Sequence, residues 1–182
     1  MLKSPDALLT PDARWTNTTG GIDDVTGAVR RIAISDLYAL VQPLELSPSV
    51  PPDIVEQFDK ARHAFIYSWF AYDLVSLAEQ QGYQTLELAL REKLPPNERM
   101  KAHDRRWGLD KLLERAVAHR WLVRTDFEVP DSHAKRGKVC MLDVIARCRN
   151  ELAHGSRNLL PALSIEMLGL CHEVLNKLFQ KE

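Results

Sequence analysis

The pattern of hydrophobic and polar positions along the chain predicts a mainly helical protein. From Asp53 onward, apolar residues recur every three or four positions, which is the spacing of one face of an α-helix. Asp53 is a candidate N-cap for this helix, and a break is expected near Gly82. The apolar stripe continues through Leu77 and comprises Ile54, Phe58, Ala61, Phe65, Trp69 and Tyr72.

The same spacing predicts four more helices, over residues 83–94, 108–122, 139–154 and 161–179. Gly155 suits the left-handed position that follows a helix, and Pro161 suits the first turn of the last one. Residues 124–138 are expected to form a loop, and no run of alternating β-branched residues favours a strand. We therefore predict an all-α fold, a helical bundle of about five helices.

Residues 1–50 lack this clear periodicity and are predicted to form an N-terminal arm beside a bundle over residues 51–182. Residues 1–25 combine Pro, Asp, Thr and Asn with a Gly-Gly pair, a composition typical of a partly flexible or loosely packed segment. For residues 28–46, the pattern leaves open a short helix or extended segments. It also leaves open whether the arm packs against the bundle or reaches a second subunit.

Composition narrows the class of protein without naming a function. With 182 residues, 45% of them hydrophobic and 27% charged, the chain suits one globular domain. Its three cysteines include no CxxC pair, which favours a reducing compartment over a disulfide framework. We see no secretion signal, and the longest apolar stretch is far shorter than the roughly 20 residues that span a bilayer. A cytoplasmic protein without a membrane partner is expected.

The net charge of −1 hides an uneven distribution. Residues 91–160 hold 16 Lys and Arg against 10 Asp and Glu, whereas residues 1–90 hold 6 against 12. A basic half could attract phosphate groups, although charges also segregate by chance on solvated helix faces. The candidate phosphate-binding or RNA-binding side chains are Arg105, Arg106, Lys135, Arg136, Lys138 and Arg147.

The segment RCRNELAHGS, residues 147–156, concentrates polar chemistry at the end of a predicted helix. At about 100° per residue, Asn150 and His154 lie four positions apart on one surface, beside Arg147. Arg149 lies about 140° from His154 on the same helical wheel. These residues could form a solvated helix face, or they could form half of a phosphate-handling site that a second copy of the helix completes.

The RNELAHG segment resembles the signature of the HEPN superfamily (higher eukaryotes and prokaryotes nucleotide-binding domains), in which an Arg and a polar residue precede a His. Arg149, Asn150 and His154 match that signature, and the resemblance covers about residues 53–180. It implies a homodimeric, metal-independent endoribonuclease, found among toxins and phage-defence effectors, with RNA as substrate and a cognate antitoxin as a further partner. Some relatives lack activity, so a non-catalytic helical module that binds a protein partner or nucleotide is the alternative.

Metal-free RNA cleavage would give each of these residues a role and would need no cofactor. His154 can act as base or acid near neutral pH, and Arg149 offers a planar fork of donors to phosphate oxygens. Asn150 could orient His154, bind a phosphate oxygen, or only polarise the helix end. We therefore treat Arg149, Asn150 and His154 as the candidate catalytic residues.

Other chemistry has less support in the sequence. His133, Cys140, Cys148 and His154 lack the tight ligand pairs of a metal site, so no metal is expected. Cys171 lies on the apolar stripe of the last helix and is predicted to pack in the core rather than act as a nucleophile. Arg105 and Arg106 precede Trp107 and could clamp RNA, but such a cluster is more often a charged helix end beside a buried indole.

Overall fold

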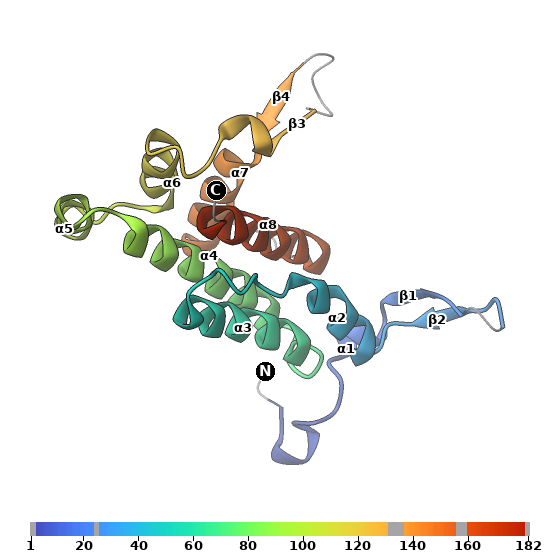
Figure 1. Ribbon diagram of the computed structural model, residues 1–182. Coiled ribbons are helices and arrows are strands. Elements are labelled where there is room, and N and C mark those ends of the chain that lie inside the picture. The colour runs from blue at the N-terminus through green and yellow to red at the C-terminus, as the bar shows by residue number, and fades with distance from the viewer. Residues whose placement is uncertain (1–2, 24–25, 131–136, 156–159, 181–182) are drawn as a thin grey trace.

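The computed structural model describes residues 3–23, 26–130, 137–155 and 160–180, and in these ranges the chain is mainly helical (Figure 1). Two short helices, α1 (Ala13–Thr16) and α2 (Ile34–Val41), precede the long helices. The longer helices are α3 (Pro52–Tyr67), α4 (Leu74–Lys93), α5 (Pro96–Asp104), α6 (Leu109–Ala118), α7 (Met141–Ala153) and α8 (Pro161–Phe179). The described residues also form three short 3-10 helices: Pro5–Ala7 before α1, Gln42–Leu44 after α2, and Arg124–Phe127 between α6 and α7.

Helix α4 forms the centre of the fold, since it contacts α3, α8, α6 and α7 (Figure 1). Leu86, Ala89 and Leu90 on α4 are fully buried, and Gly82 allows α8 to approach closely. A Cβ atom on Gly82 would lie 2.8 Å from Cδ2 of Leu168 on α8. The prediction of a helix break near Gly82 is therefore wrong, because this glycine serves helix packing inside α4.

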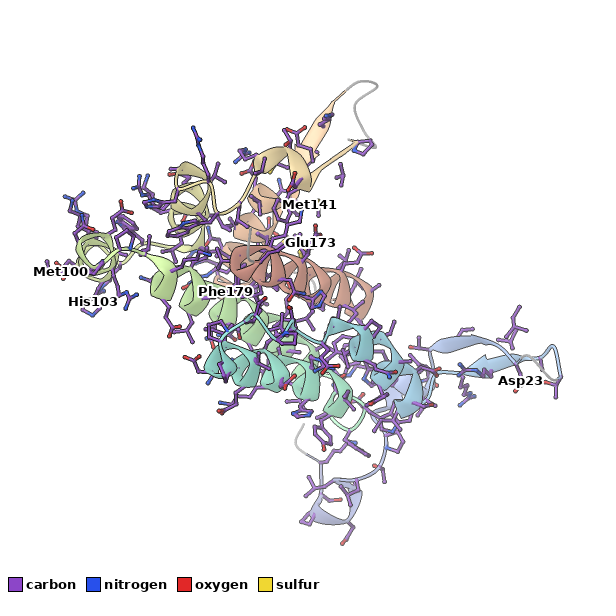
Figure 2. All side chains as sticks on the ribbon, in the orientation of Figure 1. Asp23, Met100, His103, Met141, Glu173 and Phe179 are labelled. Atoms are coloured by element: carbon purple, nitrogen blue, oxygen red, sulfur yellow. The ribbon has the colours of Figure 1, made fainter. Side chains whose placement is uncertain are left out.

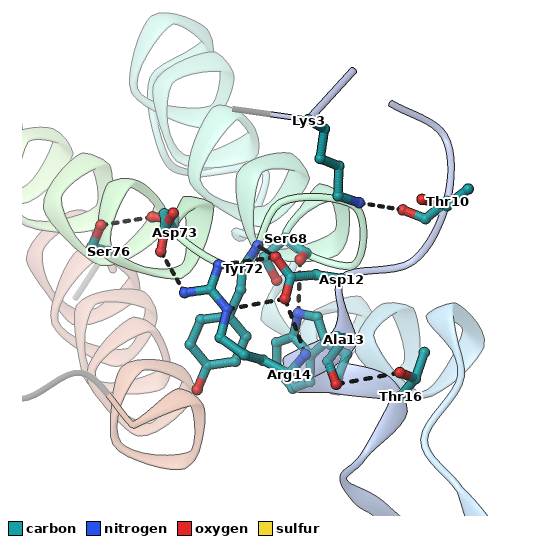
Figure 3. Close-up of polar contacts among 11 residues, drawn as sticks. Lys3, Thr10, Asp12, Ala13, Arg14, Thr16, Ser68, Tyr72, Asp73 and Ser76 are labelled. Atoms are coloured by element: carbon teal, nitrogen blue, oxygen red, sulfur yellow. Dashed lines mark hydrogen bonds and ion pairs between the residues drawn. The ribbon is translucent and has the colours of Figure 1, made fainter. Parts of the chain in front are cut away.

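The break between α3 and α4 lies instead at residues 68–73, and the N-terminal segment contacts it directly (Figure 3). The Asp12 N–H donates to the Trp69 carbonyl at 2.8 Å, and the Asp12 side chain accepts from the Tyr72 N–H at 3.2 Å. Arg14 binds Asp73 at 2.7 Å. Trp69 and Tyr72 consequently lie outside the helix that their spacing predicted, because contacts from a distant segment hold them in a turn.

Residues 1–50 contribute buried side chains to the same core as the bundle. Trp15 is 3% exposed, and its Nε1 donates to the Ser68 carbonyl at 2.7 Å. Leu37 and Val41 on α2 are buried, as are Leu46 and Val50 beyond it. The division into an arm and a bundle at residues 50/51 stays a prediction, and these described parts of the arm pack against the helices.

Two small antiparallel ladders were not expected from the pattern. Strands β1 (Thr19–Ile22) and β2 (Val29–Arg31) form a hairpin that projects from the helical body (Figure 1). Strand β3 (Glu128–Pro130) lies in the range predicted as a loop and pairs with β4 (Lys138–Cys140). Strand β4 extends two residues into the range predicted as a helix, so α7 begins at Met141 and not at Val139. The prediction of a mainly helical fold is confirmed, whereas the absence of strands is corrected. In the part of the chain that the structure describes, no helix is long and apolar enough to cross a membrane.

Candidate functional site

Helix α7 carries most of the RNELAHG segment and has one buried side and one exposed, polar side. Leu142, Ile145 and Ala146 are buried on the inner side of this helix. On the opposite side four polar residues are exposed: Asp143, Arg147, Asn150 and His154. Met141, Cys148 and Leu152 are half-buried and pack against the core.

The end of α7 fixes the position of His154. His154 is the C-cap residue, and its N–H donates to the Asn150 carbonyl at 3.0 Å. Gly155 follows with a φ of 67°, and its N–H donates to the Leu152 carbonyl at 3.1 Å. This left-handed conformation confirms the predicted role of Gly155, because glycine adopts it without a steric penalty.

Asn150 and His154 share a shallow groove of about 430 Å³ beside the first turn of α6. Arg147 also lines this groove, and Ala146 contributes a small side chain to its wall. The groove therefore combines an imidazole, an amide and a guanidinium at one exposed surface. Such groups can bind a phosphate oxygen and transfer a proton.

Arg149 lies on a different side of the helix and does not line this groove. Its Nε donates to Glu87 Oε1 on α4 at 2.7 Å, and its Nη1 reaches Asn150 Oδ1 at 3.4 Å. The Arg149 guanidinium instead lines a separate cavity between α4, α5 and α7. Arg149 and His154 thus line different cavities in one copy of the chain, as their separation on the helical wheel predicts.

The other predicted phosphate-binding residues are scattered over the surface. Lys138 pairs with Glu128 across the β3–β4 ladder at 3.0 Å. Arg105 and Arg106 are both exposed near the end of α5, but only Arg106 lines a cavity. Lys135 and Arg136 lie outside the described residues, so their prediction is not tested.

No pattern in the sequence indicates that Glu87 is the residue that binds Arg149. Glu87 is one of many acidic residues on amphipathic helices, and it lies 62 positions from Arg149 in the chain. Its carboxylate also lies 3.9 Å from the Arg91 guanidinium. Only the packing of α7 against α4 brings these three charges together.

The cysteines and histidines of the described residues do not form a metal-ligating group of three or more with acidic residues. Cys171 is fully buried on α8, as its place in the apolar stripe predicts. Burial raises the pKa of its thiol far above the usual range, which keeps it protonated and unreactive. His133 lies outside the described residues.

Comparison of this chain with models of protein families, with curated proteins and with solved structures gives no match.

Proposed function

We propose that this protein is a metal-independent endoribonuclease of the HEPN type, a toxin or phage-defence effector that acts as a homodimer. The observation that carries the proposal is the exposed groove at the end of α7, where Arg147, Asn150 and His154 line one surface. An exposed imidazole next to an amide and a guanidinium suits general acid–base chemistry on a phosphodiester. RNA is the substrate class because its 2′-hydroxyl supplies the nucleophile without a metal ion.

In this mechanism His154 exchanges protons with the 2′-hydroxyl or with the leaving 5′-oxygen. The guanidinium of Arg149 stabilises charge on the pentacoordinate phosphorus, and Asn150 orients His154 or binds a phosphate oxygen. The products are a 2′,3′-cyclic phosphate and a free 5′-hydroxyl.

A second copy of the chain would complete the site. Arg149 and His154 line different cavities of one copy, and a partner's α7 that crosses this one would bring an Arg149 and a His154 to one phosphate. The groove itself is exposed at the end of α7 and offers a surface for that helix. Each copy would then supply one His154, so one imidazole acts as base and the other as acid.

The ion pair between Arg149 and Glu87 favours a second candidate function. A guanidinium that is held by a carboxylate on α4 stabilises the fold and need not act on RNA. In that case the chain is a non-catalytic helical module that binds a nucleotide or a protein partner, such as an antitoxin.

Cleavage of single-stranded RNA in EDTA separates the two functions. We expect the wild type to cut and to leave cyclic phosphate ends, and His154→Ala to be slower by about 100-fold or more, the usual contribution of a general acid or base. His63→Ala is the matched control, because His63 is an exposed histidine on α3, away from α7.

The molar mass of the same samples in solution is measured by light scattering, and we expect the mass of a homodimer. Equal cleavage by wild type and His154→Ala would contradict the catalytic proposal, and so would a strictly monomeric active enzyme. RNA that stays intact with every variant would favour the non-catalytic module.

A further inference from the structure

The cavity that contains Arg149 is distinct from the groove that contains His154. It has a volume of about 750 Å³ and lies between the second half of α4, helix α5, the turn after α5 and helix α7. Figure 2 shows that α5, with His103 and Met100 labelled, projects from the body at one end of the molecule. This size is within the range of small-molecule sites, which is roughly 300 to 1,000 Å³.

The cavity is lined by more positive than negative side chains. Four arginines contribute to its walls against two glutamates, Glu87 and Glu92, and they are Arg91, Arg99, Arg106 and Arg149. His103 also lines the cavity. The lining thus carries two more positive than negative formal charges, which favours an anionic ligand.

Two of these arginines donate to no carboxylate among the described residues. Arg99 donates to the backbone carbonyls of Glu92 and Leu94, and the Glu92 carboxylate nearby contributes an opposing charge. Arg106 is exposed and forms no ion pair with any described residue. Arg91, by contrast, donates to the carbonyls of Ala102 and Trp107 and so fixes the turn after α5.

Trp107 supplies an aromatic surface next to these cations. Its side chain is half-buried and lines the cavity, and none of the ring or cation–π contacts among the described residues involves it. Guanidinium groups beside an indole form the combination that binds single-stranded nucleic acid, because the base stacks on the ring and the phosphate binds the cation.

We propose that this cavity binds one nucleotide unit of single-stranded RNA, with its phosphate against Arg99 and Arg106 and its base against Trp107. The inference rests on the proposed function, since it names where the strand lies beside the cleavage site. Arg149 lines this cavity and Asn150, the next residue, lines the groove. A strand that leaves the cavity therefore passes the end of α7 that carries His154.

The backbone at Arg106 makes a clean test possible. Arg106 follows α5 with a φ of 48°, a left-handed conformation that favours glycine. Arg106→Gly therefore removes the cation without straining the fold. Arg120, which follows α6 with a φ of 61° and does not line the cavity, offers Arg120→Gly as a matched control of equal charge and similar backbone conformation.

Binding is measured by fluorescence anisotropy with a labelled 2′-O-methyl oligoribonucleotide, which lacks the nucleophilic hydroxyl and cannot be cut. We expect Arg106→Gly to weaken binding about tenfold, as loss of a charged hydrogen bond does. The slope of log affinity against log salt concentration should also fall by about 0.7, because one phosphate contact is lost. Arg120→Gly should bind like the wild type, and both variants should unfold at or above the wild-type denaturant concentration.

Equal affinity of Arg106→Gly and the wild type would overturn the inference, and so would equal losses in the two glycine variants or no binding by the wild type. The proposed function is tested separately by cleavage of unmodified RNA. If the protein cleaves RNA but binds it independently of Arg106, only the inference about the cavity is overturned. If binding depends on Arg106 but no RNA is cleaved, only the catalytic proposal is overturned.

Discussion

Arg149 on α7 and Glu87 on α4 form an ion pair with an Nε–Oε1 distance of 2.7 Å. The pair is partly solvent-exposed, since the side chains of Arg149 and Glu87 are 33% and 16% exposed. Glu87 thereby turns the guanidinium toward the cavity beside α5 and away from the groove of His154. The charge that the proposed chemistry needs is thus partly neutralised in the isolated chain.

Replacing Glu87 with glutamine should strengthen RNA binding. Glu87→Gln keeps a side chain of the same shape but removes the negative charge, so Arg149 attracts phosphate more strongly. We expect affinity for the non-cleavable oligonucleotide to rise about two- to fivefold, with a loss in the free energy of unfolding below about 1 kcal/mol, as for other exposed pairs. Anisotropy and urea unfolding measure the two effects.

Glu56→Gln is the control for this change, because it removes an equal charge from an exposed pair with Lys60 on α3. It should leave RNA affinity unchanged. Weaker binding by Glu87→Gln would show that the ion pair positions Arg149 for RNA rather than competing with it.

Replacing two helical glycines, Gly82 and Gly169, with alanine should change the free energy of unfolding in opposite directions. In Gly82→Ala the new Cβ would lie 2.8 Å from Leu168 Cδ2, a fully buried atom that has little room to move. Overpacking outweighs the gain in helix propensity, and we expect the free energy of unfolding to fall by about 1 kcal/mol. Gly169→Ala meets no atom within 4 Å, so it should gain about 0.5–1 kcal/mol.

Urea unfolding followed by circular dichroism measures both glycine variants. A gain in stability for Gly82→Ala would show that α4 and α8 can move apart at small cost, contrary to the close contact described above.

The Glu98 carboxylate should make stability depend on pH in the acid range. Arg115 donates to it, with Nε 2.9 Å from Oε2, and His119 Nε2 lies 3.1 Å from the same oxygen. Hydrogen bonds from Arg115 first and His119 second lower the pKa of Glu98 from 4.5 to about 2. Because the folded pKa is lowered, the stabilisation is complete above pH 4.5 and is lost as the pH falls toward 2.

Comparison of wild type with Glu98→Gln by urea unfolding tests this dependence. The wild type should be more stable at pH 7, and its advantage should shrink as the pH falls from 5 to 3. Glu114→Gln corrects for the change in net charge, since it removes an exposed carboxylate that pairs with Lys111 on α6. A difference between wild type and Glu98→Gln that stays constant with pH would contradict the expectation.

Hydrophobic periodicity predicts a helix when a row of apolar side chains along one side of that helix is buried. Helix α8 begins at Pro161 as expected, and Leu168, Cys171, Leu175 and Leu178 are buried along it. Helix α5 was not predicted because Ala102 is its only buried residue. Its contact with α6 depends on the ion pair between Glu98 and Arg115, which are 17 positions apart and leave no periodic signal.

Long-range contacts also explain the boundary that the sequence misplaced. Trp69 and Tyr72 continue the apolar spacing of α3, but Asp12, some 60 positions earlier, binds the backbone of both residues. No local pattern contains that information. At the candidate site, helix geometry alone predicted the exposed face of Asn150 and His154 and the divergence of Arg149, whereas the attachment of Arg149 to Glu87 required the packed structure.

The anchorage of Trp15 affects how shortened forms of this protein would behave. A fragment starting at Pro51 would lose the indole that binds the Ser68 carbonyl and would uncover the side of α3 that α2 covers. Exposed apolar surface of this kind promotes self-association. An oligomer formed by such a fragment would reflect the uncovered α3 surface, so the pairing of α7 helices has to be measured on the chain with its first fifty residues attached.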